Sequence, residues 1–314
     1  MTQNSQYRHV EEIIEKIHKV LGLFRGYRTL HADGRFYKGT FRATAAARDY
    51  TRAIHLQGDE LPVSVRFSKG GGDPFAHFSS TVGMATRFYL ADGRVTNLVM
   101  LSQKLFIANT IEQFLALVTA GVPVEPGGHI NMDGLKAALA RNPNSLAVFQ
   151  MRAASPAPIS FAHTEFHAVH VFRYVNAASV ETHVRCHWVP VDGVKGQPSD
   201  ALSKLEPDVL FKEFDERLLQ QPARFDLTLE FAERGDPLDD ATALWPEGRR
   251  RMAIGRLTLT APTNEAEIGD RVMNHDPTML VDGIEATDDP ILQIRRGVYE
   301  LSAAQRSGGS HGHA

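Results

Sequence analysis

Short β-rich runs separated by turns limit the fold of this chain more than any other feature of its sequence. Stretches such as LPVSVRFS, MATRFYL, RVTNLVML, RFDLTLEF and AIGRLTLTA are rich in β-branched and aromatic residues, which favour strands. Segments with helical spacing lie between or outside these runs and do not alternate with each of them. That order is typical of antiparallel sheets with grouped helices. The sequence therefore predicts one α+β domain with enough strands to close into a barrel.

Turn signals predict how neighbouring strands connect. Ala91-Asp92-Gly93 joins two of the runs and indicates a hairpin. Around Ala32-Asp33-Gly34, the stretch RTLHADGRFYKGTFRAT predicts two β-rich runs joined by a tight turn, which would place His31 in a β-context. The stretch VETHVRCHW alternates apolar side chains with charged or imidazole ones. It is expected to be a strand with one buried face.

Helices are predicted where apolar residues recur every three or four positions. This spacing occurs at residues 10–24, 133–141, 207–219 and across ILQIRRGVYE at residues 291–300. A capping box from Thr110 to Gln113 predicts the start of a further helix, which is expected to end near Gly121.

Composition and charge exclude several functions. The chain has 314 residues, of which 43% are hydrophobic and 23% charged, as in an ordinary globular protein. A formal net charge of -3 offers no basic field for nucleic acid. The single cysteine, Cys186, excludes an intramolecular disulfide and any cysteine-built zinc or iron–sulfur site.

The termini and the most apolar stretch predict a cytoplasmic protein. The N-terminal MTQNSQYRHVEEIIEKIHKV lacks the pattern of a secretory signal, and LFIANTIEQFLALVTAGVPV is too mixed in polarity to form a membrane span.

The last residues are rich in glycine, serine and histidine. They predict a disordered tail at residues 307–314, after a single domain at residues 1–306.

A pair of side chains near the C-terminal end suggests chemistry. Arg295 precedes Tyr299 by four positions, so the two share one face of the predicted helix. They can be surface neighbours without a function. A guanidinium beside a phenol also stabilises the phenolate, which is a hard oxygen ligand for ferric iron. The pair alone leaves both interpretations open.

The stretch HTEFHAVH offers a competing metal site. His163, His167 and His170 follow at spacings of four and three, and on a helix they would share a face able to hold zinc. However, the adjoining VHVFRYVN has strand character, which would scatter them, and no carboxylate base is placed as in the HExxH motif. Zinc is therefore the weaker of the two metal hypotheses.

Several segments together carry a resemblance to a known family. They are RTLHADGRFYKGTF, SVRFS, GMATRFYLADG, VFRYVNAASVETHVRCHWVPVDG and IEATDDPILQIRRGVY. Segment by segment and in the same order, from about Arg25 to Arg306, the sequence resembles the haem catalases, and most of all the short catalase-related peroxidases. The resemblance implies a catalase-like antiparallel β-barrel core with surrounding α-helices, without the long threading arm and C-terminal helical domain of full-size catalases. It also implies haem b as the cofactor.

The resemblance assigns roles to residues around the haem iron. His31 matches the distal histidine, and Ser68 matches the serine that orients its imidazole. Tyr299 matches the proximal iron ligand, and Arg295 matches the charge partner of that phenolate.

Further positions match residues around the haem itself. Arg28, Arg66 and Arg306 correspond to the arginines that meet the haem propionates, where guanidinium groups suit carboxylates. Phe106, Phe114 and His170 correspond to two aromatic residues and a histidine close to the pocket. The family has an asparagine beside the distal histidine, and this sequence has Leu101 there, followed by Ser102.

These matches predict a haem peroxidase, of the enzyme class EC 1.11.1.-, that takes part in the response to oxidative stress. It would reduce hydrogen peroxide or organic hydroperoxides with a small organic electron donor and have at most weak catalase activity. Two alternatives stay open. One is a fatty-acid hydroperoxide isomerase or dehydratase, although such relatives carry threonine directly before the distal histidine, where this chain has Leu30. The other is a haem-binding protein without enzymatic activity. The sequence leaves the oligomeric state open, a homodimer included.

Overall fold

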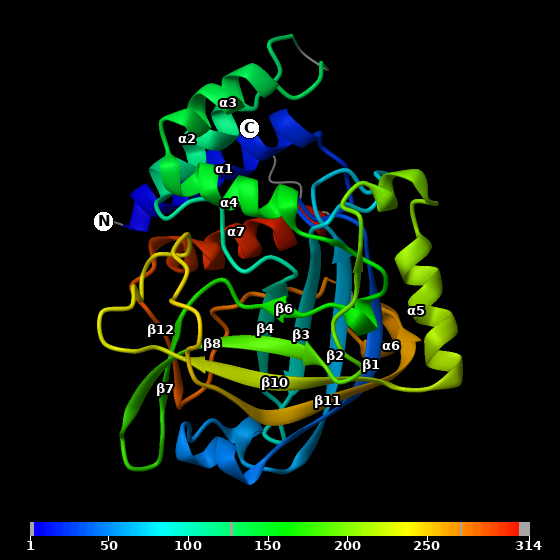
Figure 1. The fold of residues 1–314 in the computed structure, drawn as a ribbon, viewed down its shortest axis with the longest axis vertical. Coiled ribbons are helices and arrows are strands. Elements are labelled where there is room, and N and C mark those ends of the chain that lie inside the picture. Colours follow the sequence, from blue (N-terminus) through cyan, green and yellow to red (C-terminus); the bar gives the residue numbers. More distant parts are fainter. Residues whose placement is uncertain (1–2, 126–127, 271, 308–314) are drawn as a thin grey trace.

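An eight-stranded antiparallel barrel forms the centre of the molecule (Figure 1). The computed structural model describes residues 3–125, 128–270 and 272–307. The barrel strands are β1 (Gly34–Ala43), β2 (Glu60–Lys69), β3 (Val82–Tyr89), β4 (Val95–Leu101), β6 (Phe166–His167), β8 (Glu181–Pro190), β10 (Ala223–Phe231) and β11 (Arg251–Thr263). They pair in the order β10-β11-β1-β2-β3-β4-β6-β8, and pairing of β8 with β10 closes the ring. The predicted fold class is confirmed.

Further short strands lie beside the barrel. β7 (Phe172–Val175) pairs with β8, and β12 (Ile284–Ala286) pairs with β7. β5 (Ala157–Pro158) and β9 (Gly196–Gln197) pair with each other. The hairpin predicted at Ala91-Asp92-Gly93 is confirmed, because β3 and β4 are antiparallel neighbours and Leu90 N–H donates to Arg94 O at 2.9 Å.

Large aromatic side chains fill the inside of the barrel. Phe41 is fully buried, with its ring centroid 5.2 Å from that of Phe88 and 5.8 Å from that of Trp188. Gly255 on β11 makes room for it, because a Cβ at that position would lie 2.3 Å from Phe41 Cζ. The interior is therefore packed with protein, and a ligand site must lie elsewhere.

A group of helices covers one end of the barrel. It consists of α1 (Gln3–Leu21), α2 (Ile111–Ala120), α3 (Met132–Ala140), α4 (Pro143–Ala154) and α7 (Pro290–Arg306), which Figure 1 shows above the strands. Their apolar faces form a second core, in which Ile13 and Ile17 of α1 pack with Ile111 and Phe114 of α2 and Ile294 of α7. α5 (Val209–Gln220) runs along the side of the barrel, and α6 (Glu265–Ile268) is a single turn.

The predicted helices are confirmed. Thr110 caps α2, with its Oγ1 accepting from Gln113 N–H at 3.1 Å, and Gln113 Oε1 accepts from Asn109 N–H at 2.9 Å. α1 ends at Leu21, three residues before the predicted end. α4 was not predicted from the sequence. None of the helices in the described parts of the chain combines the length and the apolar character that a bilayer-spanning helix requires.

The prediction of a strand before Ala32 is wrong. The structure has β1 from Gly34 onward but no strand at residues 28–33, and His31 adopts the left-handed conformation with φ of 53°. The physical reason is Arg66, whose Nη1 and Nη2 donate to the carbonyl oxygens of His31 and Ala32 at 3.0 and 3.1 Å. The Arg66 guanidinium thus satisfies two backbone carbonyl groups that a neighbouring strand would otherwise bind.

The half-buried strand predicted at VETHVRCHW is confirmed as β8, but its polar face is buried from Arg185 onward. Arg185 and His187 are 4% and 3% exposed, although they alternate with the buried Cys186 and Trp188. The segment after β10 covers this face, because Arg185 Cζ lies 4.6 Å from the ring centroid of Trp245. Of the predicted tail, Ser307 caps α7, and residues 308–314 lie outside the described residues.

Replacement of Phe41 by alanine tests the barrel interior. Phe41→Ala is expected to lower the free energy of unfolding by about 3–5 kcal/mol, because it leaves a cavity beside the rings of Phe88 and Trp188. Chemical denaturation measures this. Phe75→Ala is the control, since Phe75 is 69% exposed and its loss should change stability little. Equal effects of the two substitutions would contradict the packing described here.

Candidate active site

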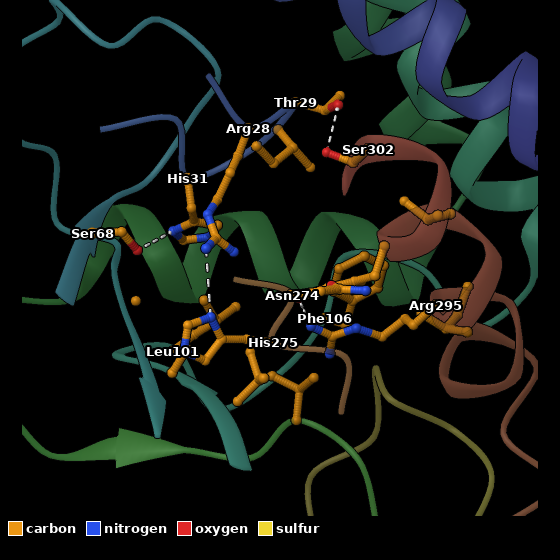
Figure 2. A pocket seen from close by; sticks show the side chains of 18 of the residues that line it. Arg28, Thr29, His31, Ser68, Leu101, Phe106, Asn274, His275, Arg295 and Ser302 are labelled. Atoms are coloured by element: carbon orange, nitrogen blue, oxygen red, sulfur yellow. Dashed lines mark hydrogen bonds between the residues drawn. The ribbon is translucent and has the colours of Figure 1, made fainter. Parts of the chain in front are cut away.

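A cavity of about 200 Å³ lies between the barrel and the helices that cover it. Its walls come from the segment at residues 28–31, from β2, β3 and β4, and from α1, α2 and α7. Figure 2 shows His31 and Ser68 on one side of this cavity and Arg295, which α7 carries, on the other. Much of the lining is apolar, for example Ile13, Val99 and Ile294. A smaller set of polar side chains, including His31, Ser68 and Arg295, also lines the cavity.

His31 and Ser68 form a hydrogen-bonded pair in the cavity wall. His31 Nδ1 lies 3.0 Å from Ser68 Oγ (Figure 2). Gly83 on the neighbouring strand allows this pair to form, because a Cβ there would lie 2.6 Å from Ser68 Oγ and 2.8 Å from His31 Nδ1. Burial lowers the pKa of His31 to about 3, and the positive charges of Arg66 and Arg295 add to the effect. The imidazole is therefore uncharged at neutral pH and able to accept a proton.

Tyr299 lies at the end of a chain of polar contacts that leads from the cavity to the buried His170 and Asp289. Arg295 Nη2 donates to Tyr299 Oη at 2.7 Å, and Arg295 Nη1 lies 3.1 Å from His170 Nε2. A guanidinium can only donate, so His170 Nε2 accepts and its Nδ1–H donates to Asp289 Oδ2, 2.6 Å away. Burial lowers the pKa of His170, against the raising effect of its bond to Asp289. These contacts fix the guanidinium with one N–H group directed at the phenol oxygen.

Asp289 also fixes the start of α7. Its Oδ1 accepts from the backbone N–H groups of Ile291 and Leu292 at 2.9 and 3.3 Å, and Pro290 occupies the first helical position. One carboxylate thus caps the helix and orients His170. The helix then carries Arg295 and Tyr299 on one face, four positions apart.

Three arginines meet at the same cavity. Arg28 and Arg306 donate to Met273 O at 2.8 and 3.3 Å, and Arg66 donates to the carbonyls of residues 31 and 32. None of the three forms an ion pair with an acidic side chain in the described parts of the chain. Arg306 Nε is also buried there without a hydrogen-bond partner. The cavity therefore contains more positive charge than the described protein groups balance.

Burial and mutual repulsion lower the pKa values of these arginines. Burial lowers the pKa of Arg28 well below its usual range, and the charges of Arg66 and Arg306 lower it further. Burial likewise lowers the pKa of Arg66 to about 10, with a further contribution from Arg306. A ligand with a carboxylate or similar anionic group would relieve the repulsion between these like charges.

The aromatic positions predicted for the site lie in the same walls. Phe106 and Phe114 line the cavity, with ring centroids 5.6 Å apart. Leu101 at the end of β4 also lines it. Ser102 does not add a polar group there, because its Oγ donates to Ser80 O and accepts from Val82 N–H, both at 3.0 Å.

The structure brings the predicted site residues together. Those that line the cavity are His31, Ser68, Arg28, Arg66, Phe106, Phe114, Arg295, Arg306 and Tyr299. His170 lies behind Arg295. Asp289, Gly83 and His275 were not predicted. For Asp289, the sequence Asp-Pro before a helical segment signals a cap, but its contact with His170 joins residues 119 positions apart.

The histidines of the competing zinc hypothesis do not converge. His163 Nδ1 lies 2.9 Å from Gly193 O, His170 bonds to Asp289, and His167 lies on β6. His167 Nδ1 instead lies 2.8 Å from His187 Nδ1, close enough to Glu165 for a metal-like grouping within 4.8 Å. That group is satisfied by protein contacts, since His187 bonds to Glu230 and Glu165 pairs with Arg251.

Comparison with known proteins shows what the chain is similar to. A family model described as Catalase matches residues 26–313. The chain is 35% identical over 306 residues to a catalase-related peroxidase of Mycolicibacterium paratuberculosis, with 96% of each chain covered. It is 31% identical over 301 residues to a catalase-related peroxidase of Synechococcus elongatus, covering 95% of this chain and 89% of that protein. Catalase-2 of Bacillus subtilis is 30% identical, with 91% of this chain and 44% of that protein covered.

Replacement of Asp289 tests the chain of contacts behind Tyr299. Asp289→Ala should lower the free energy of unfolding by about 3 kcal/mol or more, because it removes a helix cap and leaves buried donors without acceptors. Thermal or chemical denaturation measures this. Asp288→Ala is the matched control, since the neighbouring carboxylate is exposed. A loss no larger than that of the control would show that Asp289 does not support the site.

Proposed function

The chain belongs to the catalase family, and from that premise we propose that it is a haem peroxidase, an oxidoreductase that acts on peroxide. The substrate would be hydrogen peroxide or an organic hydroperoxide, and the electron donor a small organic molecule. The observation that carries the proposal is the content of one cavity: a phenol held by a guanidinium, an uncharged histidine held by a serine, and three arginines that have no acidic partner among the residues the structure describes.

The donor set of the cavity fits haem b. Haem has a flat apolar ring with two propionates, and the buried Nε of Arg306 is one of the donors that lack a partner among the described residues. Arg28, Arg66 and Arg306 would pair with the propionates, and apolar side chains such as Phe114 would contact the ring. Tyr299 would hold the iron through its phenolate oxygen, with Arg295 balancing the charge. Bound haem iron supplies the redox chemistry that cleaves the oxygen–oxygen bond.

His31 would move the proton in this reaction. Its Nδ1 is engaged by Ser68, so Nε2 is the nitrogen left to exchange a proton with a hydroperoxide. The uncharged imidazole would take the proton from the hydroperoxide and return it to the departing oxygen, first as a general base and then as a general acid. Ser68 would hold the ring in the orientation that both transfers need, and Gly83 gives the pair its space.

The apolar wall near His31 favours an organic reductant over a second peroxide. Leu101 occupies the position where catalases have an asparagine, and Ser102 turns its hydroxyl to backbone groups of Ser80 and Val82. Neither side chain supplies an amide to orient peroxide. The wall therefore supports peroxidase activity with weak catalase activity.

Rearrangement of fatty-acid hydroperoxides has less support. Leu30 precedes His31 directly, and Thr29 Oγ1 donates to Ser302 Oγ of α7 at 3.3 Å (Figure 2). The threonine hydroxyl is thus engaged with the helix and not with His31.

The site residues range from Arg28 to Arg306, which supports one haem-binding domain at residues 1–306. A buried, unpaired cysteine supports a cytoplasmic location.

Haem reconstitution with paired variants tests the proposal. The wild type should take up haem and show the absorption spectrum of a high-spin ferric, phenolate-ligated iron. Tyr299→Phe should lose or shift that spectrum, whereas Tyr27→Phe, a change at a tyrosine that is 42% exposed, should not. His31→Ala should keep the spectrum and lose about 10²-fold or more in peroxide turnover, because it lacks the general base. A wild type without haem uptake, or an unchanged Tyr299→Phe spectrum, would refute the proposal.

Replacement of Leu101 tests the substrate preference. Leu101→Asn should raise turnover of peroxide alone relative to turnover with a phenolic donor by about five-fold, as expected for one added hydrogen bond. Oxygen release and dye oxidation measure the two rates. Leu101→Met conserves volume without adding an amide and serves as the control. A wild type that turns over peroxide alone as fast as with a donor would contradict the preference.

A further inference from the structure

His275 is a buried histidine to which neither proton transfer by His31 nor iron binding by Tyr299 assigns a role. It lies between α6 and β12, is 1% exposed and lines the cavity (Figure 2). Its ring stacks on Phe36 with centroids 6.1 Å apart. Its Nε2 is buried and has no hydrogen-bond partner among the described residues. A polar atom in such a place requires an explanation.

The hydrogen-bonding partner on the other side of the ring fixes the tautomer of His275. Arg28 Nη2 lies 3.5 Å from His275 Nδ1 (Figure 2). A guanidinium has donors only, so Nδ1 must accept. Burial and the charges of Arg28, Arg87 and Arg66 lower the pKa of His275 well below its usual range, so the ring carries a single proton. That proton is on Nε2, and the unpartnered atom is a donor.

The surroundings identify the kind of acceptor that this donor lacks. Arg28, Arg66, Arg87 and Arg306 all contribute positive charge at His275. Arg87 is balanced by Asp270, with Nη1 2.6 Å from Oδ2, whereas the other three have no acidic partner in the described parts of the chain. The nearby carbonyl of Met273 already accepts from Arg28 and Arg306. An anion would both accept a hydrogen bond from the free donor and neutralise the unbalanced charge. A water molecule would only accept the hydrogen bond.

We propose that His275 binds haem, with its Nε2–H donating to a propionate carboxylate alongside Arg28, Arg66 and Arg306. The role rests on the proposed haem peroxidase function and adds a neutral donor to the three cationic ones. His275 keeps its proton because Arg28 occupies its other nitrogen. Arg28 therefore both pairs with the carboxylate and sets the tautomer of its neighbour.

The rate of haem loss tests this role. Haem-loaded protein is mixed with an excess of an apoprotein that captures free haem, and the transfer is followed by absorption. His275→Phe keeps the aromatic ring against Phe36 and removes the donor. It should lose haem about tenfold faster or more, the effect expected of a hydrogen bond to a charged group. His275→Gln retains a donor and should recover part of the slow rate.

A second buried histidine provides the matched control. His55 is 5% exposed, has an unpartnered Nδ1 among the described residues and packs on Phe88, and it does not line this cavity. His55→Phe should leave the rate of haem loss unchanged, even if it alters thermal stability. An equal acceleration in both variants would mean that general destabilisation is the cause, and would overturn the role of His275.

Haem whose two propionates are esterified isolates the contact itself. With the dimethyl ester, wild type and His275→Phe should lose the ligand at equal rates, because the anionic acceptor is gone. A tenfold difference that persists with the ester would overturn the assignment to a propionate. Slow haem loss from both wild type and His275→Phe would overturn it as well, while the proposed function stands. If the wild type binds no haem, the proposed function itself fails.

Discussion

Pairing of β8 with β10 closes the sheet, and the position of the site follows from that closure. A closed ring of eight strands encloses a space of side-chain width, which Phe41, Phe88 and Trp188 fill. No large ligand fits among these rings. The ends of β2, β3 and β4 and the segment before β1 then meet the helices outside the barrel, and the cavity forms where the two cores adjoin. The barrel acts as a rigid wall that holds Arg66 and Ser68 in place.

The positive charge in the cavity destabilises the protein when no ligand is bound. Three guanidinium groups lie together with their pKa values lowered by burial, and the described acidic residues do not pair with them. Such an arrangement destabilises the protein alone, and an anionic ligand that neutralises the charge would relieve this destabilisation. Backbone carbonyls provide partial compensation. Arg66 uses them to fix the left-handed turn at His31, so one charge serves both the local fold and the ligand.

The sequence could predict the local parts of the site but not the long-range ones. Arg295 and Tyr299 share a helix face because of their spacing, and the structure shows the bond that this spacing allows. The backbone at His31 was wrongly predicted as strand, because the partner that replaces a neighbouring strand is a side chain from β2. Asp289 and His275 escaped prediction for a related reason. Their partners lie 119 and 247 positions away, and contacts between distant segments bring them together, such as the pairing of β7 with β12 beside His170 and Asp289.

The three histidines around the cavity differ in role because their partners differ. His170 has both ring nitrogens engaged, by an arginine and a buried aspartate, so it can only hold its neighbours in position. His31 has one nitrogen held by a serine hydroxyl, which can donate or accept, so its ring is free to gain and lose a proton at the other nitrogen. His275 has one nitrogen fixed as an acceptor by an arginine, which commits the other to donating. In the proposed function one side-chain type would thus supply a support, a proton carrier and a permanent donor, and the number and kind of neighbouring donors would decide which.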